Sequence, residues 1–558
     1  MQLSLPSDYS RHFLQQVAHQ TIGGSGLNPS VEPSFKPFKI NTLVCPAFSV
    51  TTFVVTGQIV GIITQTLVAA FFGAGADLDA FLIAATLPQF SIIVILNALG
   101  FVLIPAFVEL SVGGNEDEAW VTASSIITLC LLVLTLIAAA GILFAEPLIR
   151  LIAPGLSSAT IALASRMSVI LWPTVILSGA ISLLSSLYQA NSRFTWPALV
   201  PTVGAVINLG LIILLARTSL GVESLAIALL LSLIVQTVLL VPIAGAKYRF
   251  RLDWTNPGFR RVIFLVWPLL VSSLIARLTP VVDRYLASNM VAGTISQLGY
   301  AYRIVTLLAT FLSGGIATVI FPGMATSVAQ GDIGGLRRSV SQGFRIMWLV
   351  IAPVVTIGVG LALPITRVVF QRGAFVISDA AAVSRLLQLY LFALVGMCLG
   401  NITGRTFYAL KKTRLIAILG GVGALAYLAY APALAHRWGA EGLAVACVVL
   451  FNFDLTVNVI VIRAITGNHG GWKAISSIVK ITSAAVTGGF VSWVVSAQFV
   501  NVFMQFFVGG CSGVTIYVLA LLGVRSGEFK SVIREVTLIF RTRFSGLRPR
   551  LKRQVGEG

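Results

Sequence analysis

Fourteen long apolar segments run through the 558 residues of this chain and constrain its fold more than any other feature. Each segment is long enough to cross a bilayer, because a membrane-spanning helix needs about 20 apolar residues. Only α-helices and closed β-barrels satisfy every backbone group in lipid, and these segments lack the alternating pattern of barrel strands. We therefore predict an all-α, polytopic membrane protein with about 14 transmembrane helices. The segments lie near 43–72, 79–108, 120–145, 158–188, 196–216, 223–245, 261–288, 295–327, 339–362, 378–409, 414–435, 441–464, 472–498 and 502–524.

The second half of the chain repeats the first. The string Ala-Glu-Pro-Leu-Ile-Arg at 145–150 returns as Ala-Leu-Pro-Ile-Thr-Arg at 362–367. A Ser-Arg pair that ends at Arg166 returns at Arg385, with a slightly larger offset. A slowly growing offset is typical of a duplicated unit with small loop insertions. Two related helical bundles in one membrane chain favour a transporter, because a substrate path can lie between them.

The repeat and the segment boundaries predict two six-helix lobes, two extra helices, polar or basic tails and one basic linker. The predicted divisions are a cytoplasmic tail at 1–42, the first lobe at 43–245, the linker at 246–260, the second lobe at 261–466, the extra helices at 467–524 and a basic tail at 525–558.

Composition and charge agree with a membrane protein. Hydrophobic residues make up 57% of the chain and charged residues 10%, with a mean hydropathy of +0.94, which excludes an ordinary soluble domain. The net charge of +19 comes from bases in short loops and tails, so we expect no nucleic-acid partner. With 14 spans, 26 bases fall on one side and six on the other, which predicts cytoplasmic termini. The stretch 528–544 is either an amphipathic helix on the anionic inner leaflet or an ordinary positive-inside tail.

The sequence predicts no catalytic site, metal or cofactor. The five cysteines lie in apolar segments without metal-site spacing, and the four histidines fall in tails or loops. No nucleotide-binding loop and no nucleophile–base constellation stands out. We expect a protein that is not an enzyme and whose transport is driven by a gradient, the membrane potential or the substrate itself.

Charges inside the predicted spans are candidates for function, because a charge at mid-bilayer costs about 2.5–3.5 kcal/mol or more. Arg277 and Arg303 lie in consecutive segments joined by a short loop, with Asp283 and Arg284 between them. One interpretation is a cationic cavity wall that binds an anion, since guanidinium matches the oxygens of phosphate. The alternative is an internal pair of Asp283 with Arg277 or Arg303 that only fixes helix packing. The six bases inside the spans are Arg166, Arg277, Arg303, Arg385, Arg405 and Lys480.

The first lobe offers amides rather than charges at the corresponding place. Gln58 and Gln65 are seven residues apart and therefore share one helix face, where they either line a cavity or pack. In the last span of the second lobe, Asp454 follows Asn452, and its carboxylate could bind a coupling cation or form a packing hydrogen bond.

Several strings, in order and spacing, resemble the MurJ (MviN) family of lipid-linked glycan flippases, within the multidrug/oligosaccharidyl-lipid/polysaccharide exporter superfamily. Together they cover about residues 43 to 520. The strings are Phe-Gly-Ala-Gly at 72–75 followed by Asp-Ala-Phe at 79–81, Ala-Pro-Gly at 153–155, Leu-Ala-Ser at 286–288 through Tyr-Ala-Tyr-Arg at 300–303, Phe-Gln-Arg-Gly-Ala-Phe at 370–375, and Phe-Tyr-Ala-Leu at 407–410.

The resemblance implies alternating access between the lobes around a central cationic cavity, with a groove for a polyprenyl tail formed by the extra helices. It implies that Arg303 matches the cavity arginine of helix eight and that Asp79 matches the acid after helix one. We expect a monomer in the bacterial inner membrane that moves a polyprenyl-pyrophosphate-linked glycan, first of all lipid II, from the inner to the outer leaflet. The predicted substrate-binding residues are Arg303, Arg277, Asp283, Arg284, Gln58, Gln65 and Asp79.

The chain departs from the family's pattern in its first lobe. The paired arginines of helix one fall at Gln58 and Thr64, and those of helix two fall in the apolar run 92–96. A capsule, O-antigen or exopolysaccharide unit is therefore an alternative cargo. A cation-coupled drug exporter is a further alternative, although the spans of the first lobe lack interior acids. A scaffold that assembles glycan-synthesis proteins is the third.

Overall fold

The computed structural model describes most of the chain. Predictions for the N-terminal tail up to residue 40, the linker at 246–260, the basic tail from 525 and Arg277 lie outside the described residues. Residues before Val50 form a unit separate from the one that holds every contact discussed below. The described residues are 41–92, 116–191, 193–243, 274, 278–467 and 471–524.

The described residues are almost entirely helical, which confirms the predicted all-α polytopic fold. Among them, 11 helices are long and apolar enough to cross a membrane. Residues 76–92 are also helical. The helices are α2 (Asn41–Phe72), α4 (Glu116–Leu143), α5 (Ala145–Ile152), α6 (Ser158–Leu171), α7 (Pro173–Ala190), α8 (Thr195–Leu215), α9 (Glu223–Leu240), the short 3-10 turn η1 (Val241–Ile243), α11 (Thr279–Ser288), α12 (Thr294–Ala329), α13 (Ile333–Gly360), α14 (Ala362–Phe370), α15 (Ile377–Ala409), α16 (Thr413–Thr466), α17 (Gly471–Ser496) and α18 (Val502–Gly523).

The longest element, α16, contains two predicted spans. Its backbone leaves the helical region at Gly439, where φ is 57°. A residue with a side chain rarely adopts this left-handed conformation, whereas glycine adopts it at little cost. The bend divides α16 into a first arm before Gly439 and a second arm after it, as the two predicted segments require.

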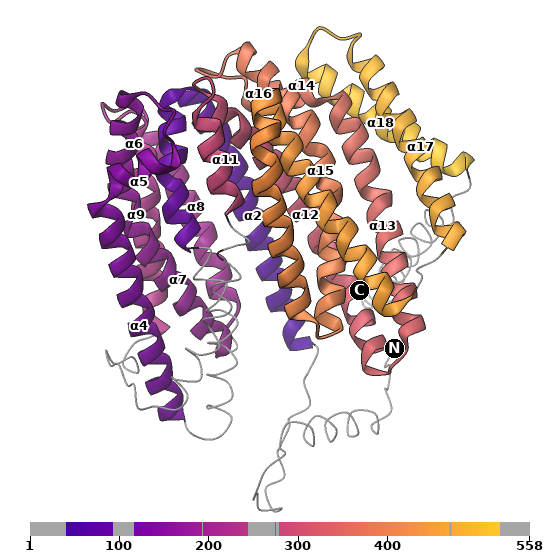
Figure 1. The fold of residues 1–558 in the computed structure, drawn as a ribbon, viewed down its shortest axis with the longest axis horizontal. Helices are drawn as coiled ribbons and strands as arrows, with labels where there is room; N and C mark the ends of the chain where they lie inside the picture. The colour runs from indigo at the N-terminus through magenta and orange to yellow at the C-terminus, as the bar shows by residue number, and fades with distance from the viewer. Residues whose placement is uncertain are drawn as a thin grey trace, which may run out of the picture. The chain divides into compact units, whose positions relative to one another are not determined.

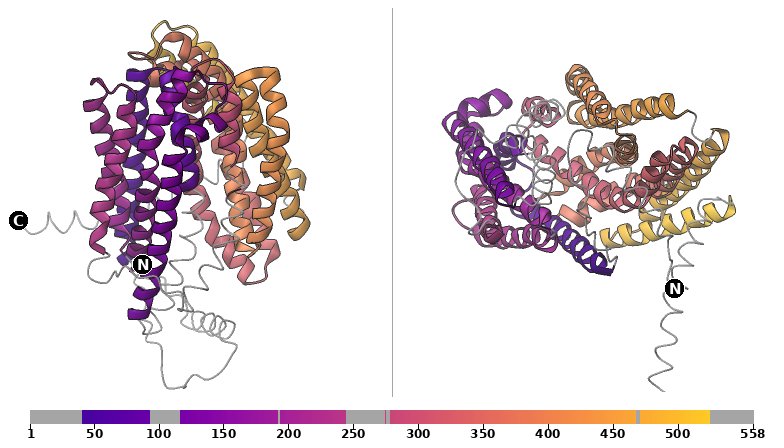
Figure 2. Two further views of the ribbon diagram at one scale, coloured as in Figure 1. Left: turned by 60° about the vertical axis from the view of Figure 1, so that its left-hand side comes forward. Right: turned by 90° about the horizontal axis from the view of Figure 1, so that it is seen from below.

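The packing follows the repeat. In the first half, α7 packs against α4, α8 and α9, and α6 packs against α9. In the second half, α15 packs against α12, α13 and both arms of α16. The last two helices, α17 and α18, lie side by side, and α17 packs against α13 (Figure 1 and Figure 2). Each half therefore has its own helical bundle, and the extra helices join the second one.

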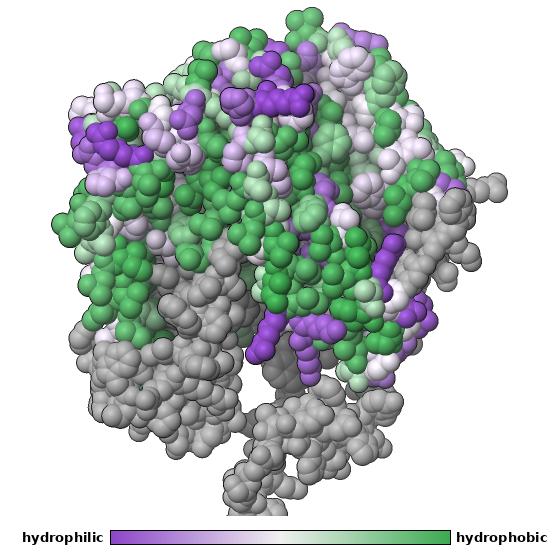
Figure 3. Space-filling view, in the orientation of Figure 1, coloured by the Kyte–Doolittle hydropathy of each residue, from purple (hydrophilic) through white to green (hydrophobic). Residues whose placement is uncertain are grey.

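The surface matches a membrane environment. On the face drawn in Figure 3, hydrophobic side chains cover the middle of the helices and hydrophilic ones gather near the helix ends. Large apolar side chains such as Leu136 of α4 and Val206 of α8 are exposed, although neither lies at the end of its helix. Exposing such apolar side chains is unfavourable in water, whereas contact with lipid acyl chains carries no such free-energy cost.

Candidate functional site

The two bundles are joined by a buried carboxylate. Asp79 is only 2% exposed, and its Oδ2 and Oδ1 accept hydrogen bonds from the backbone N–H groups of Gly293 (2.6 Å) and Ser296 (2.7 Å). These N–H groups lie at the start of α12, where a helix has unpaired donors and the positive end of its dipole. A carboxylate from the first half thus caps a helix of the second half.

Further contacts surround this bond. The hydroxyl of Tyr300 donates to the carbonyl of Gly73 (3.0 Å), and the N–H of Ala374 donates to the carbonyl of Ala70 (2.8 Å). The ring of Tyr300 packs against Phe370, with centroids 4.8 Å apart. We call this set the interlobe clasp: Ala70, Gly73 and Asp79 from the first half, and Gly293, Ser296, Tyr300, Gly373 and Ala374 from the second.

Three glycines make the clasp possible. Gly73, Gly293 and Gly373 all have positive φ, between 56° and 90°. A β-carbon on each would lie within 2.2–2.7 Å of a carbonyl oxygen of the opposite bundle. Glycine is therefore required here both by conformation and by the close approach of two backbones.

Arg303 lies one turn beyond the clasp on α12. Its side chain is exposed, and it forms no hydrogen bond or ion pair with any described residue. Its Nη2 lies 3.6 Å from the position that a β-carbon on Gly61 would occupy in α2. Gly61 is three residues from Gln58 and four from Gln65, so all three share one face of α2. We call Gln58, Gly61, Gln65 and Arg303 the central patch.

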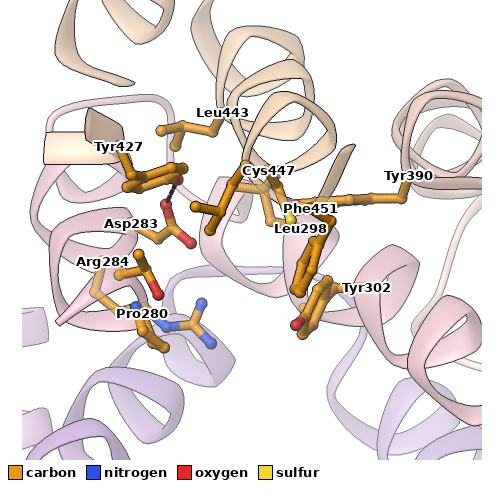
Figure 4. Close-up of a pocket in the computed structure, with 13 residues that line it drawn as sticks. Pro280, Asp283, Arg284, Leu298, Tyr302, Tyr390, Tyr427, Leu443, Cys447 and Phe451 are labelled. Carbon is orange, nitrogen blue, oxygen red and sulfur yellow. Dashed lines mark hydrogen bonds between the residues drawn. The ribbon is translucent and has the colours of Figure 1, made fainter. Parts of the chain in front are cut away.

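Asp283 and Arg284 lie elsewhere, among helices of the second bundle. The Asp283 carboxylate accepts a hydrogen bond from the hydroxyl of Tyr427 (Figure 4). Arg284 Nη1 donates to the carbonyl of Ile295 at 3.1 Å. Both residues line a small cavity of about 150 Å³ between α11, α12, α15 and α16. The structure therefore pairs Asp283 with a tyrosine and not with Arg303, which leaves the arginine available at the junction of the bundles.

The predicted site residues thus fall into three places. The structure brings Arg303 toward the helix face that carries Gln58 and Gln65, whereas Asp79 lies in the clasp and Asp283 beside Arg284 in the small cavity. A role of these residues in substrate binding stays a prediction. Three further residues, Gly61, Tyr300 and Tyr427, were not predicted as site residues, because their partners lie far away in the chain and leave no local signal.

No group of three or more His, Cys, Asp or Glu side chains within the described ranges is arranged to hold a metal ion. The candidate site is the central patch, in which one exposed guanidinium and two amides face the junction of the bundles.

This arrangement defines a class of protein. Apolar helices form two repeated bundles, and polar side chains of both bundles meet where they adjoin, as in multi-pass membrane transporters. A family model described as "Lipid II flippase MurJ" matches residues 68–511, and the chain belongs to this family. The predicted family resemblance is confirmed.

Relatives and solved structures agree with this assignment. The probable lipid II flippase MurJ of Bdellovibrio bacteriovorus is 25% identical over 492 residues, which cover 86% of this chain and 92% of the relative. The lipid II flippase MurJ of Burkholderia cenocepacia is 26% identical over 379 residues, which cover 65% and 72%. A structure of a lipid II flippase MurJ in an inward closed conformation has a TM-score of 0.75 and 22% identity, covering 85% of this chain and 98% of its own. An inward-facing multidrug resistance MATE family transporter has a TM-score of 0.60 and 15% identity, covering 74% and 94%. These two structures share the fold of this chain.

Proposed function

We propose that this protein flips lipid II, the polyprenyl-pyrophosphate-linked precursor of peptidoglycan, from the inner to the outer leaflet of the bacterial inner membrane. The observation that carries the proposal, beside membership of the family, is the exposed Arg303 guanidinium without a described partner at the junction of the bundles. An unpaired charge is costly in a membrane protein unless it faces a cavity or a ligand.

The chemistry of the central patch suits a pyrophosphate. Guanidinium offers a planar set of donors that binds two phosphate oxygens at once. Gln58 and Gln65 add amide donors and acceptors, which suit phosphate oxygens and sugar hydroxyls. Gly61 leaves room for the arginine above α2. The patch therefore binds by charge and hydrogen bonding, without covalent chemistry, and we propose a transporter that is not an enzyme.

In alternating access, the clasp is the contact between the bundles that opens and closes. It joins the bundles through backbone contacts at one end of their helices, while the central patch lies further along the same helices. The distribution of bases supports cytoplasmic termini, and in that orientation the clasp lies on the outer side. In this proposal, lipid II enters from the cytoplasmic side and leaves when the clasp opens.

A second cargo is favoured by one specific observation. Among the described residues of the first bundle, the central patch receives the amides of Gln58 and Gln65, where the family has arginines in helix one. A less anionic or differently shaped polyprenyl-pyrophosphate glycan, such as an exopolysaccharide, capsule or O-antigen unit, fits the same geometry. Anionic lipids of the inner leaflet are the proposed partners of the basic tail, and a monomer is sufficient for this mechanism.

Complementation tests the proposal. The wild-type chain should sustain growth of a bacterium depleted of its own MurJ, and Arg303→Ala should abolish growth because the pyrophosphate loses its charged partner. Arg217→Ala, which removes an exposed base from the turn after α8, is the control and should support growth. Arg303→Ala combined with Arg277→Ala should also fail while the protein still inserts. Full rescue by this double variant would contradict the proposal.

A further inference from the structure

The second bundle contains a larger cavity that the proposed function leaves unused. It has a volume of about 960 Å³ and lies between α12, α15 and the two arms of α16. Its α12 wall is formed by Tyr302, Thr306 and Thr310, which are spaced by four residues and share one face. Arg303 is on a neighbouring face of the same helix, directed at Gly61 of α2. The large cavity is thus distinct from the central patch, although the two are adjacent.

Two opposite charges line this cavity without pairing. Arg405 of α15 lies over the ring of Phe321, 5.8 Å from its centroid, and forms no ion pair with a described residue. Asp454 of α16 also lines the cavity and receives no hydrogen bond from a described residue. The buried Oδ1 of Asn458 likewise lacks a hydrogen-bond partner. Half-buried charges and an unsatisfied amide in a membrane protein are expensive, so they mark a place where something polar binds.

Glycines position the acid and keep the cavity open. A β-carbon on Gly423 would lie 2.0 Å from Asp454 Oδ1, so the carboxylate is seated directly against bare backbone of the first arm of α16. Gly400 and Gly420 line the cavity, and a β-carbon on either would meet no atom within 4 Å. The space in front of them is therefore empty of protein, and its volume is within the range of about 300–1,000 Å³ typical of ligand sites.

The two charges that line the cavity indicate which part of a ligand it binds. A phosphate would satisfy Arg405 and be repelled by Asp454, whereas a neutral sugar would leave both charges unpaired. A peptide that carries a free carboxylate and a free ammonium group satisfies both. Its amides can pair with Asn401, Asn458 and Thr306.

We propose that this cavity is a second subsite, which binds the zwitterionic peptide portion of a lipid-linked glycan while Arg303 binds its pyrophosphate. The inference rests on the proposed function, because lipid II carries such a peptide. Arg405 binds a peptide carboxylate and Asp454 binds a peptide ammonium group. Capsule and O-antigen units without a peptide would leave the subsite empty.

Binding in nanodiscs tests the inference with two probes: lipid II, and the same polyprenyl-pyrophosphate disaccharide without its peptide. Arg405→Gln and Asp454→Asn keep shape and remove charge, and each should weaken lipid II binding by about tenfold. Binding of the peptide-free lipid should not change. Gly400→Leu fills the cavity from an unobstructed position and should act on lipid II alone. Gly210→Leu is the matched control, because Gly210 lies in α8 of the first bundle and also has open space in front of it.

The outcomes separate the two proposals. Selective loss of lipid II binding in the three cavity variants supports the subsite. Equal losses for both lipids, or no loss for either, would overturn it even if the wild-type protein binds lipid II. Failure of the wild-type protein to bind either lipid would overturn the proposed function itself. Elution as a single species and an unchanged melting midpoint confirm that each variant is folded.

Discussion

The two bundles share a scaffold but differ in the groups that the scaffold presents. In the first, Gly204 makes room for the side chain of Gln236, whose Nε2 would lie 2.1 Å from a β-carbon on that glycine. In the second, at the repeat-equivalent position, Gly423 makes room for Asp454 in the same way. The glycine and its helix crossing are repeated, but the first bundle has an amide where the second has a carboxylate.

Two further contacts recur at repeat-equivalent positions of the two bundles. Gly141 lies against the ring of Trp172, and its counterpart Gly358 lies against Leu391. Arg166 pairs with Glu223, with Nη2 and Oε1 3.1 Å apart, and the repeat-equivalent Arg385 lies 3.8 Å from a carboxylate oxygen of Glu441. Helix packing and surface pairing are therefore repeated features of the duplicated unit.

The charges near possible ligands are not repeated. The first bundle presents Gln58 and Gln65 at the central patch, whereas the second presents Arg303 there and keeps Asp454 and Arg405 in its own cavity. The two bundles therefore share their helix framework, whereas the charged side chains near the possible ligand sites belong to the second bundle. We infer that the second bundle dominates capture of a charged headgroup.

The strongest test of this difference moves the charge across the junction. Arg303→Gln should lower transport about 100-fold or more, equivalent to roughly 3 kcal/mol, because the only exposed guanidinium described in the central patch is lost. Adding Gln58→Arg returns a guanidinium from the opposite helix and should restore part of the activity. Transport of lipid II in proteoliposomes measures both. No rescue would mean that the position of the charge matters, and not only its presence in the patch.

The next test concerns the clasp, where the two bundles meet. Asp79→Ala removes the acceptor of two backbone N–H groups at the start of α12, which costs roughly 3 kcal/mol. We expect the clasp to open more often, so that a cysteine introduced at the buried Ser288, in a background without native cysteines, reacts faster with a thiol reagent. Asp77→Ala is the control, because Asp77 is exposed on the same turn. Equal labelling rates in the two variants would show that Asp79 does not hold the bundles together.

The sequence predicted the scaffold well because its signals are local. Apolar length located the spans that the structure describes, and the seven-residue spacing correctly put Gln58 and Gln65 on one face of α2. The predicted start of the span at 339 was late, because α13 begins at Ile333 with polar turns capped by the Asp332 side chain, which accepts from the N–H of Gly335. Hydropathy does not detect such polar turns.

The site was predicted less completely because its contacts are distant in the chain. Asp79 bonds to N–H groups in the other half of the sequence, and nothing near it indicates that partner. Arg303 was identifiable as a charge inside an apolar span, whereas its approach to Gly61 of α2 is visible only in three dimensions. The pairing of Asp283 with Tyr427 could not be predicted from the sequence either, because the two residues are 144 positions apart.

A matched pair of glycine variants sharpens the comparison of amide and acid. Gly204→Ala and Gly423→Ala each force the end of a polar side chain to move, so both should lose a similar amount of stability, about 1–3 kcal/mol. Only Gly423→Ala displaces a charge that lines the large cavity, so it alone should weaken binding of lipid II, by about tenfold. Thermal unfolding and nanodisc binding measure the two effects. A similar loss of binding in both variants would show that helix packing, and not Asp454, is responsible.

The smallest effect is expected where the bundles are most alike. Glu223→Gln and Glu441→Gln each remove one of the repeat-equivalent ion pairs, and surface pairs of this kind contribute at most about 1 kcal/mol. Glu223 should matter more, because its side chain is 23% exposed against 53% for Glu441 and its pair is shorter. Both acids also lie in the first turn of a helical segment, where negative charge is favourable. Melting midpoints at low and high salt should therefore fall slightly in both variants, with the difference between them reduced by salt. If either variant instead abolished transport while remaining folded, the paired acids would belong to the working parts of the flippase, and the bundles would differ less in function than their charges indicate.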